Sequence, residues 1–391
     1  MSAQVSRATT ASNLITKKDA QLLLDHLDLN ALGAKEMELS IKDHRFMVET
    51  SLEEDLQNHL LESMDRKNSR FIGIVVMNAN SGQILALAGF DKLDPNSNPC
   101  LLSRFPAASI FKIVTAAAAV EHCGYQADTR LHFNGYKHTL YKSQLKDRIN
   151  AYTNTLTFKD SFAQSVNPIF GKLGSLRLGK PILEQYAAAF GFNQPIDFEL
   201  PIRPSHVAID DKPYHWAEIA SGFNNDTTLS PLHAAMMASA VVNEGRMKAP
   251  TIVERITDDS GRLIYRSQNA WQGRAMSSRA AVTLARLMET TVKSGTGRKA
   301  FRGANRDHVL SKLRIGGKTG SIYNRAHDAR FDWFVGFAKE KRGPGQLAIA
   351  VVVAHEEYIG IRAARYARMA MAHYFNSHLA NQQKGDASSG S

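Results

Sequence analysis

The sequence predicts an α+β fold in which one sheet takes its strands from both halves of the chain and a mainly helical segment interrupts it. Apolar, β-branched runs begin near residue 71 and again after residue 332, whereas residues 105–300 show mainly helical spacing and loops. Strands at both ends with a helical middle indicate one α+β unit with an insertion. The chain has 391 residues, 43% of them hydrophobic, which is enough to bury a substantial core.

Two hairpins account for most of the predicted strands. Residues 71–77 and 83–89 are apolar and flank a cluster of Asn, Ser and Gly, which is a hairpin pattern. Residues 332–338 and 347–354 are equally apolar and enclose a polar turn that contains Gly-Pro-Gly. A further strand is expected to carry Lys318, just before the second hairpin.

Helical periodicity marks the other elements. Leucines recur on one face of residues 52–64 at the spacing of an amphipathic helix. The expected helices cover residues 19–32, 52–64, 109–122, 158–178, 231–243 and 361–379. Residues 1–48 are predicted to form a polar and helical N-terminal segment, and the small, polar residues 381–391 a disordered tail.

The charge and hydropathy exclude several functional classes. The formal net charge is +11, but Lys and Arg are spread along the chain without a basic arm, so nucleic-acid binding is not predicted. A weak attraction to an anionic cell envelope stays open. No apolar run approaches the ~20 residues of a membrane span, and the N-terminus lacks a signal peptide. The chain is therefore expected to be soluble or separated from an anchor.

The two cysteines give no sign of a metal site. Cys100 and Cys123 lack metal-ligand spacing, so neither a metal nor another cofactor is predicted. Free thiols are expected, although a disulfide between the two stays open.

A candidate nucleophile lies in the segment Ser109-Ile110-Phe111-Lys112, at a predicted helix start. Residues three apart on a helix share a face, so the Ser109 hydroxyl and the Lys112 amine would be neighbours. A serine hydroxyl becomes a nucleophile when a base takes its proton, and lysine serves as that base when burial or nearby cations lower its pKa. Taken alone, the spacing is common, and a helix cap beside a surface charge is the simpler interpretation.

A second polar segment is Ser165-Val166-Asn167, in a predicted helical stretch before Pro168. The Ser165 hydroxyl could shuttle a proton, and the Asn167 amide could hold the lysine and a substrate carbonyl. Taken alone, a helix terminus followed by a proline is again the simpler interpretation.

A third segment, residues 316–321 (GGKTGS), precedes the second hairpin. A phosphate-binding loop is rejected because Lys312 stands where such a loop needs its first glycine, and because the segment leads into a strand. On a strand, Lys318 and Thr319 are suited to binding a substrate carboxylate, and Gly320 would let a substrate backbone approach closely.

In this order the segments match S-x-x-K, S-x-N and K-T-G, a set shared by penicillin-binding proteins and class A β-lactamases. The chain resembles the transpeptidase domain of high-molecular-mass penicillin-binding proteins over residues 49–380. Other matching segments are residues 49–57 (ETSLEEDLQ), 80–86 (NSGQILA), 186–192, 229–232, 243–245, 294–297 and 333–336 (WFVG).

The resemblance implies a five-stranded antiparallel sheet flanked by helices, an inserted all-helical subdomain, and an active site in the groove between them. It implies attack by Ser109 on the penultimate D-Ala carbonyl of a peptidoglycan stem peptide. The terminal D-Ala leaves, and an amine takes the acyl group from the serine. The resemblance also implies acylation by β-lactam antibiotics and a periplasmic location on the outer face of the cell envelope, with an anchor or envelope partners outside this chain.

The same resemblance assigns roles to the residues of the three motifs. Lys112 would be the general base, with Asn167 holding it, and Ser165 with Lys318 would relay protons. Lys318 and Thr319 would bind the terminal carboxylate beside Gly320. The backbone N–H groups of Ser109 and Ser321 would form the oxyanion hole.

Three positions depart from the family pattern. Ala108 replaces the usual glycine before the nucleophile, and Ser321 stands where threonine is common. Residues 221–225 (SGFNN) replace a Gly-Gln-Gly stretch, which leaves the shape of the cleft open. The first 48 residues are too few for the family's large pedestal domain and no glycosyltransferase domain is seen, so a truncated chain or a reduced member is expected.

Other functions stay open on the same fold. A D,D-carboxypeptidase would use water as the acceptor, and a β-lactam sensor would be acylated once without turnover. A class A β-lactamase needs a Glu-x-x-Leu-Asn loop, which is absent between Asn167 and Lys318, although a route through a lysine carbamate stays open.

Overall fold

A five-stranded antiparallel sheet forms the centre of the computed structural model, which describes residues 14–25 and 34–389, with side chains through residue 382. The strands are β3 (Ser69–Asn78), β4 (Ile84–Asp91), β13 (Leu313–Tyr323), β14 (Arg330–Glu340) and β15 (Gln346–His355), in the spatial order β13-β14-β15-β3-β4. Because β15 pairs with β3, the two predicted hairpins join into one sheet, which confirms the predicted fold class. The strand that carries Lys318, β13, lies at an edge of the sheet.

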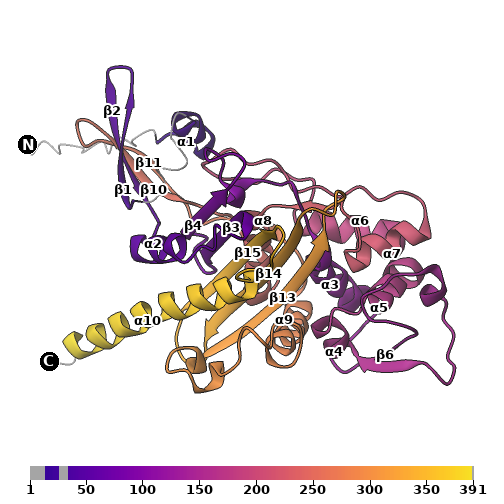
Figure 1. The fold of residues 1–391 in the computed structure, drawn as a ribbon. Coiled ribbons are helices and arrows are strands. Elements are labelled where there is room, and N and C mark those ends of the chain that lie inside the picture. The colour runs from indigo at the N-terminus through magenta and orange to yellow at the C-terminus, as the bar shows by residue number, and fades with distance from the viewer. Residues whose placement is uncertain (1–13, 26–33, 390–391) are drawn as a thin grey trace, which may run out of the picture.

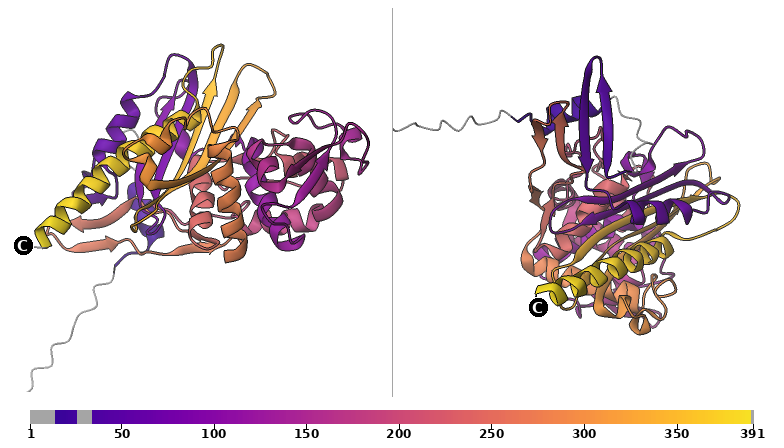
Figure 2. Two further views of the ribbon diagram at one scale, coloured as in Figure 1. Left: turned by 90° about the horizontal axis from the view of Figure 1, so that it is seen from below. Right: turned by 90° about the vertical axis from the view of Figure 1, so that its left-hand side faces the viewer.

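Helices cover both faces of this sheet (Figures 1 and 2). They are α2 (Glu54–Glu62), α3 (Lys112–His122), α8 (Pro231–Val242), α9 (Ser278–Lys293) and α10 (Ala363–Ser389). Successive side chains of a strand point to opposite faces, so each face buries a separate apolar cluster. Trp333 and Val335 join α3 and α8 on one face, whereas Phe334 joins α2 and α10 on the other.

The insertion between β4 and β13 adds a second, mainly helical lobe beside the sheet (Figure 1). Its helices are α4 (Phe158–Ala163), α5 (Asn167–Lys172), a π-helical turn (Leu173–Leu178), α6 (Gly179–Ala189) and α7 (Pro213–Ser221). The insertion also holds short strand pairs: β5 (Phe105–Pro106) with β8 (Thr228–Leu229), β6 (Arg130–Phe133) with β7 (Asn154–Thr157), and β9 (Arg246–Lys248) with β12 (Trp271–Arg274). The helix expected over 158–178 is therefore three shorter segments.

The N-terminal segment differs from the prediction of a polar, helical region. Helix α1 (Lys17–Leu24) is present, but residues 1–13 and 26–33 lie outside the described part of the chain. Strands β1 (Glu36–Ile41) and β2 (His44–Thr50) form a hairpin whose sheet continues through β10 (Val253–Asp258) to β11 (Leu263–Arg266). Met37, Leu39 and Ile41 alternate with polar residues, which is the two-residue period of a strand. The boundary predicted at residue 49 consequently falls inside β2.

The C-terminal segment also differs from the prediction. Helix α10 continues through the expected disordered tail as far as Ser389 (Figure 1). Ala, Gln and Lys are good helix formers, and extending an existing helix needs no new nucleation. In the part of the chain that the structure describes, no helix is both long and apolar enough to cross a membrane.

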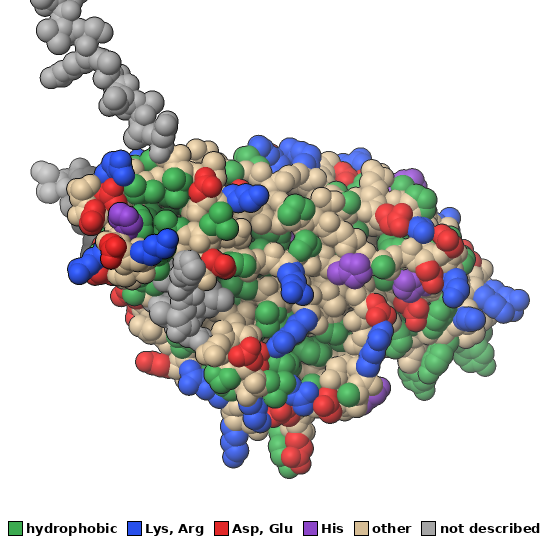
Figure 3. Space-filling model, turned by 90° about the horizontal axis from the view of Figure 1, so that it is seen from above, with side chains coloured by type: hydrophobic (Ala, Val, Ile, Leu, Met, Phe, Trp, Pro, Cys, Tyr) green, Lys and Arg blue, Asp and Glu red, His purple; other side chains and the backbone are tan. Residues whose placement is uncertain are grey.

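The cysteines and the charged side chains can now be placed. Cys100 is buried and Cys123 is partly buried, and both are free thiols. Basic and acidic side chains are interspersed on the face of the molecule shown in Figure 3.

Candidate active site

The Ser109 side chain stands at the start of a helix, as predicted. Strand β5 leads into a 3₁₀ turn, Ala108–Phe111, and α3 follows directly from Lys112. Ala108 has a φ of 47°, in the left-handed region, so the chain turns sharply just before the serine. The Lys112 Nζ atom lies 2.9 Å from the Ser109 Oγ atom, which confirms that the two side chains are neighbours.

Lys112 is fully buried, and its surroundings favour a neutral amine. Its Nζ atom lies 2.7 Å from Asn167 Oδ1 and forms a short hydrogen bond to the Ser221 carbonyl. The Phe170 ring lies 5.5 Å from the same nitrogen. Burial and, to a smaller extent, the charge of Lys318 lower the pKa of Lys112 well below its usual value. A neutral amine that donates to two carbonyl oxygens keeps one lone pair, and the remaining neighbour is Ser109 Oγ.

The predicted helical stretch is wrong at Ser165, which lies between two helices, whereas Asn167 is the first residue of the second helix. Helix α4 ends at Ala163, Ser165 has a φ of 56°, and Asn167 begins α5. Pro168 therefore sits in the first turn of a helix, where its missing N–H costs nothing. Asn167 is fixed by two main-chain contacts: its N–H donates to the Lys137 carbonyl at 2.7 Å, and its Nδ2 donates to the His138 carbonyl at 3.0 Å.

Lys318 approaches the same place from the edge strand β13. It is fully buried, and its Nζ donates to Ser165 Oγ at 2.9 Å and to the Thr319 carbonyl at 2.7 Å. Burial lowers the pKa of Lys318 to about 7. The Phe162 ring lies 5.5 Å from this nitrogen and 6.2 Å from the Phe170 ring, so an apolar floor supports both lysines.

The rest of the K-T-G motif continues along β13. The Thr319 hydroxyl lies 2.5 Å from the hydroxyl of Thr296. A Cβ atom on Gly320 would lie 3.3 Å from the Ile110 side chain and 3.4 Å from Ala108, so the strand passes directly beside the turn that carries Ser109. The Ser321 hydroxyl donates to Asp332 Oδ1 on the neighbouring strand at 3.1 Å.

The eight predicted residues therefore converge on one cleft. Its volume is about 850 Å³, and five of the eight line it: Ser109, Ser165, Asn167, Thr319 and Ser321. Lys112 and Lys318 lie beneath it and reach it through the two serines. Asp332 is the one carboxylate among the described residues that line the cleft.

Several groups that shape the site could not be recognised from a side-chain motif. The contact from the Ser221 segment to Lys112 is a main-chain carbonyl. Gly222 has a φ of 65°, and a Cβ atom there would lie 1.8 Å from the Ala108 carbonyl oxygen, so only glycine fits against the strained turn. Phe162 and Phe170 read as ordinary core residues. Of these groups, only Gly222 could have been noticed in the sequence, because a glycine at the end of a helical run is typical of a helix C-cap.

Comparison with protein families identifies the kind of domain that this chain contains. The family described as "Penicillin binding protein transpeptidase domain" matches residues 72–372. The chain is 26% identical over 283 residues to Stage V sporulation protein D of Bacillus subtilis, covering 68% of this chain and 42% of that protein. It is 24% identical over 322 residues to the peptidoglycan D,D-transpeptidase PbpA of Mycolicibacterium smegmatis, covering 72% and 61%. The chain spans about half the length of these relatives.

Solved structures share the fold. The D,D-transpeptidase domain of a peptidoglycan glycosyltransferase from Eggerthella lenta has a TM-score of 0.68 at 22% identity, covering 85% of this chain and 83% of that one. Penicillin-binding protein 3 of Mycobacterium tuberculosis complexed with aztreonam has a TM-score of 0.70 at 21% identity, covering 85% and 79%. The imipenem acyl-enzyme complex of penicillin-binding protein A from M. tuberculosis has a TM-score of 0.67 at 22% identity, covering 83% and 78%.

Proposed function

Because this chain belongs to the penicillin-binding protein transpeptidase family, we propose that it is a serine D,D-transpeptidase that cross-links peptidoglycan stem peptides on the outer face of the cell envelope. The observation that carries the proposal is the convergence of Ser109, a buried Lys112 and the Ser165–Lys318 pair on one cleft. A hydroxyl beside a neutral amine is the arrangement that nucleophilic catalysis requires.

In the proposed acylation step, Ser109 Oγ attacks the carbonyl of the penultimate D-Ala while Lys112 takes the hydroxyl proton. The backbone N–H groups of Ser109 and Ser321 stabilise the oxyanion, a contribution worth about 10²- to 10³-fold in rate for each donor. The C–N bond then breaks, and the leaving D-Ala amine takes a proton from Ser165. Ser165 is resupplied by the Lys318 ammonium, which lies 2.9 Å away.

Deacylation reverses these transfers. The acceptor amine attacks the ester and loses its proton through Ser165 to Lys318, while the Lys112 ammonium returns its proton to Ser109 Oγ. An amide has replaced the original peptide bond, and the protein is back in its starting protonation state. Asp332, the only acid lining the described part of the cleft, is already held by Ser321, so it supports no role in activating water.

β-Lactams would acylate Ser109 by the same first step. One structural neighbour is itself an imipenem acyl-enzyme complex. The test is covalent labelling with a fluorescent penicillin, with the wild-type protein beside Ser109→Ala. We expect an adduct that the variant lacks, and labelling that persists in Ser109→Ala would show that another residue is the nucleophile.

The acceptor is tested with an acyl-D-Ala-D-Ala peptide, with and without an added amine. Release of D-Ala together with a new amide product supports transpeptidation. Release with hydrolysis alone would indicate a D,D-carboxypeptidase, and rapid loss of the penicillin adduct would indicate a β-lactamase.

A further inference from the structure

The strand that carries the K-T-G motif has few side chains to hold it where it passes Ser109. β13 is an edge strand, so within the sheet it pairs with β14 alone. Glycine occupies positions 316, 317 and 320, and glycine weakens a strand because it has no side chain to pack. Beyond the motif's lysine, two hydroxyls fasten the strand: Thr319 bonds to Thr296 at 2.5 Å, and Ser321 bonds to Asp332 at 3.1 Å.

Asp332 lies directly across from Ser321, on β14. The two are register partners, so their side chains stand on the same face of the sheet. One carboxylate oxygen accepts the Ser321 hydroxyl, and the other accepts the N–H of Ala363, the first residue of α10, at 3.0 Å. Asp332 is 6% exposed, and Ala363 is fully buried. The carboxylate therefore connects the edge strand to the start of a packed helix.

The negative charge of Asp332 suits this position. The first turn of α10 contains no acidic residue, and an anion is favourable at a helix N-terminus because the aligned peptide dipoles place positive charge there. Arg362 and His355 approach the carboxylate at 3.8 and 3.9 Å, which is too far for hydrogen bonds. The two directional contacts, to Ser321 and Ala363, are therefore the ones that fix where the strand lies.

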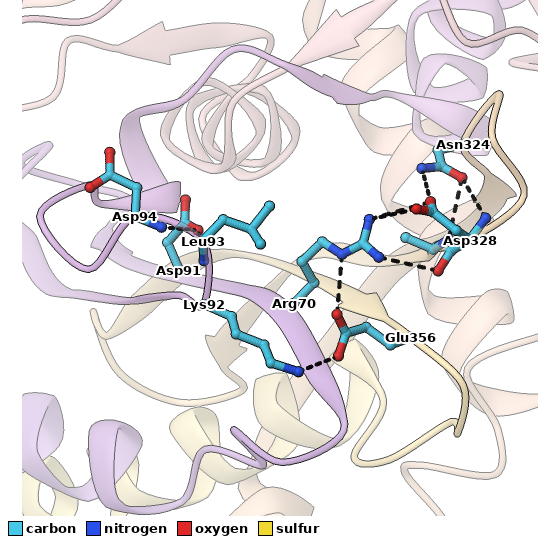
Figure 4. Close-up of polar contacts among 9 residues, drawn as sticks. Arg70, Asp91, Lys92, Leu93, Asp94, Asn324, Asp328 and Glu356 are labelled. Carbon is cyan, nitrogen blue, oxygen red and sulfur yellow. Dashed lines mark hydrogen bonds and ion pairs between the residues drawn. The ribbon is translucent and has the colours of Figure 1, made fainter.

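A second acid in the same hairpin provides a comparison. Asp328 lies in the turn between β13 and β14, where Arg70 and Asn324 hold it (Figure 4). Its side chain is about half exposed, and it does not belong to the lining of the cleft. Asp328 thus fastens the turn, whereas Asp332 fastens a residue of the cleft.

Resting on the proposed function, we infer that Asp332 is a positioning residue of the acylation step. Its carboxylate holds Ser321, and with it the Ser321 backbone N–H that is proposed for the oxyanion hole, at a fixed distance from Ser109. An oxyanion donor works when it lies about 2.7–3.1 Å from the place where the charge develops. A small shift of the edge strand would consequently weaken it. Asp332 acts through Ser321 and takes no proton.

The first experiment removes the carboxylate and follows acylation by penicillin. We expect Asp332→Ala to lower the first-order acylation constant at saturating penicillin by about 30-fold, a part of the 10²- to 10³-fold that one oxyanion donor contributes. The affinity of the complex before acylation should change by less than about threefold, because the contact serves the transition state.

Two variants separate positioning from a general loosening of the hairpin. In Asp332→Asn the amide can accept from the Ala363 N–H and donate to Ser321 Oγ, so this variant should stay within about threefold of the wild type. Asp328→Asn removes the charge from the turn and should match the wild type. Full activity in Asp332→Ala, or an equal loss in Asp328→Asn, would overturn the inference.

A double-mutant cycle tests whether the Ser321 hydroxyl acts through Asp332. Ser321→Thr and Ser321→Val have nearly the same shape, but only threonine can donate to the carboxylate. We expect Ser321→Thr to stay within about threefold of the wild type and Ser321→Val to be about tenfold slower. In the Asp332→Ala background, Ser321→Val should cost less than about threefold more. An undiminished loss there would mean that the hydroxyl acts on the substrate directly, and Asp332 would have no positioning role.

A failure of the proposed function gives a different result. If fluorescent penicillin does not label Ser109, the role of Asp332 is judged from hydrogen exchange of the β13 amides, measured by mass spectrometry. Faster exchange of residues 313–323 in Asp332→Ala, with wild-type exchange there in Asp328→Asn, would still show that Asp332 holds the edge strand. Unchanged exchange in Asp332→Ala would overturn it.

Discussion

The two ends of the cleft carry the same sign of charge in opposite environments. At the lysine end, Lys112 and Lys318 are fully buried on a floor of phenylalanine rings, and burial lowers both of their pKa values. Arg362 and Arg365 also line the cleft, at what we call the arginine end, where Arg362 is about half exposed and Arg365 is exposed. A guanidinium in water stays charged, whereas a buried ammonium gives up its proton easily.

This difference separates side chains that can exchange protons from side chains that stay charged, within one cavity. A lysine that exchanges protons near neutral pH can act as a base or a relay, but it costs stability because the folded chain must bury it. An exposed arginine cannot exchange protons, yet it holds a carboxylate at every physiological pH. The backbone is strained at the lysine end, where Ala108 and Ser165 both have positive φ values.

Removing Lys112, the proposed base, should have the largest effect. In Lys112→Met the side chain keeps its length and its contact with Phe170 but cannot accept the Ser109 proton. We expect the rate of acylation by penicillin to fall about 10³-fold, the usual contribution of a general base. A time course of fluorescent-penicillin labelling measures it.

Lys172→Met is the matched control for this prediction. Lys172 is also nearly buried and lies on α5, but it contacts the His132 carbonyl and Asp147 instead of the cleft. Its rate should stay within about threefold of the wild type. An unchanged rate in Lys112→Met would mean that some other group activates Ser109.

The second prediction concerns the stability of Lys318→Met. This variant is expected to be more stable than the wild type although it is slower in acylation. The pKa of Lys318 is about 7 in the folded chain, against 10.5 as its usual value. Between these pH values the unfolded chain binds more protons, so the folded chain loses stability as the pH falls from 10.5 to 7 and then stays level. Lys318→Met removes this loss.

We expect Lys318→Met to be more stable than the wild type by on the order of 2 kcal/mol at pH 7, with the gap closing toward pH 10. Urea unfolding at pH 7, 8.5 and 10 measures it. Equal stability at pH 7, or a gap that does not shrink with rising pH, would mean that Lys318 keeps its charge in the folded protein.

The third prediction is an alkaline limb in the acylation rate of the wild-type protein. In the proposed mechanism, protonated Lys318 attracts the carboxylate and resupplies Ser165, and this form disappears as the pH rises through about 7. Above that value the second-order rate constant for acylation should therefore fall, with a limiting slope of about tenfold for each pH unit. In Lys318→Met, which is slower throughout, the limb should vanish; its persistence there would assign it to a different group.

The five-stranded sheet could be predicted because its strands are continuous apolar runs, whereas the smaller sheet offers only a short alternation of Met37, Leu39 and Ile41 with polar residues. Strands β1 and β2 are short and half-exposed, and they are completed by β10, which lies about 200 residues later in the sequence. Pairing between distant segments depends on the whole fold, so local periodicity cannot reveal it.

Three residues of the site could be predicted because they take part through their side chains, whose types and spacing are visible in the sequence. Ser109 and Lys112 share a helical face, and Lys318 comes at a fixed order along the chain. The supporting parts could not be predicted in the same way. The Ser221 group in contact with Lys112 is a peptide carbonyl, and Asp332 is hidden within an apolar strand whose pattern indicates only burial.

The smallest effect is expected from the backbone beneath the lysine end. Ala108 holds a left-handed φ of 47°, which costs an alanine about 1–2 kcal/mol, although glycine gives back part of this through its greater freedom in the unfolded chain. Ala108→Gly should therefore raise the free energy of unfolding by about 0.5–1 kcal/mol.

Ala107→Gly provides the comparison, since Ala107 is equally buried but has an ordinary φ of −64°. It should lower stability by about 0.5–1 kcal/mol, so the two glycines would act in opposite directions at adjacent positions. Urea unfolding of both variants separates them. If both destabilise the protein alike, contact of the Ala108 methyl group with β13 outweighs the strain, and the turn before Ser109 is held by packing instead of by its backbone.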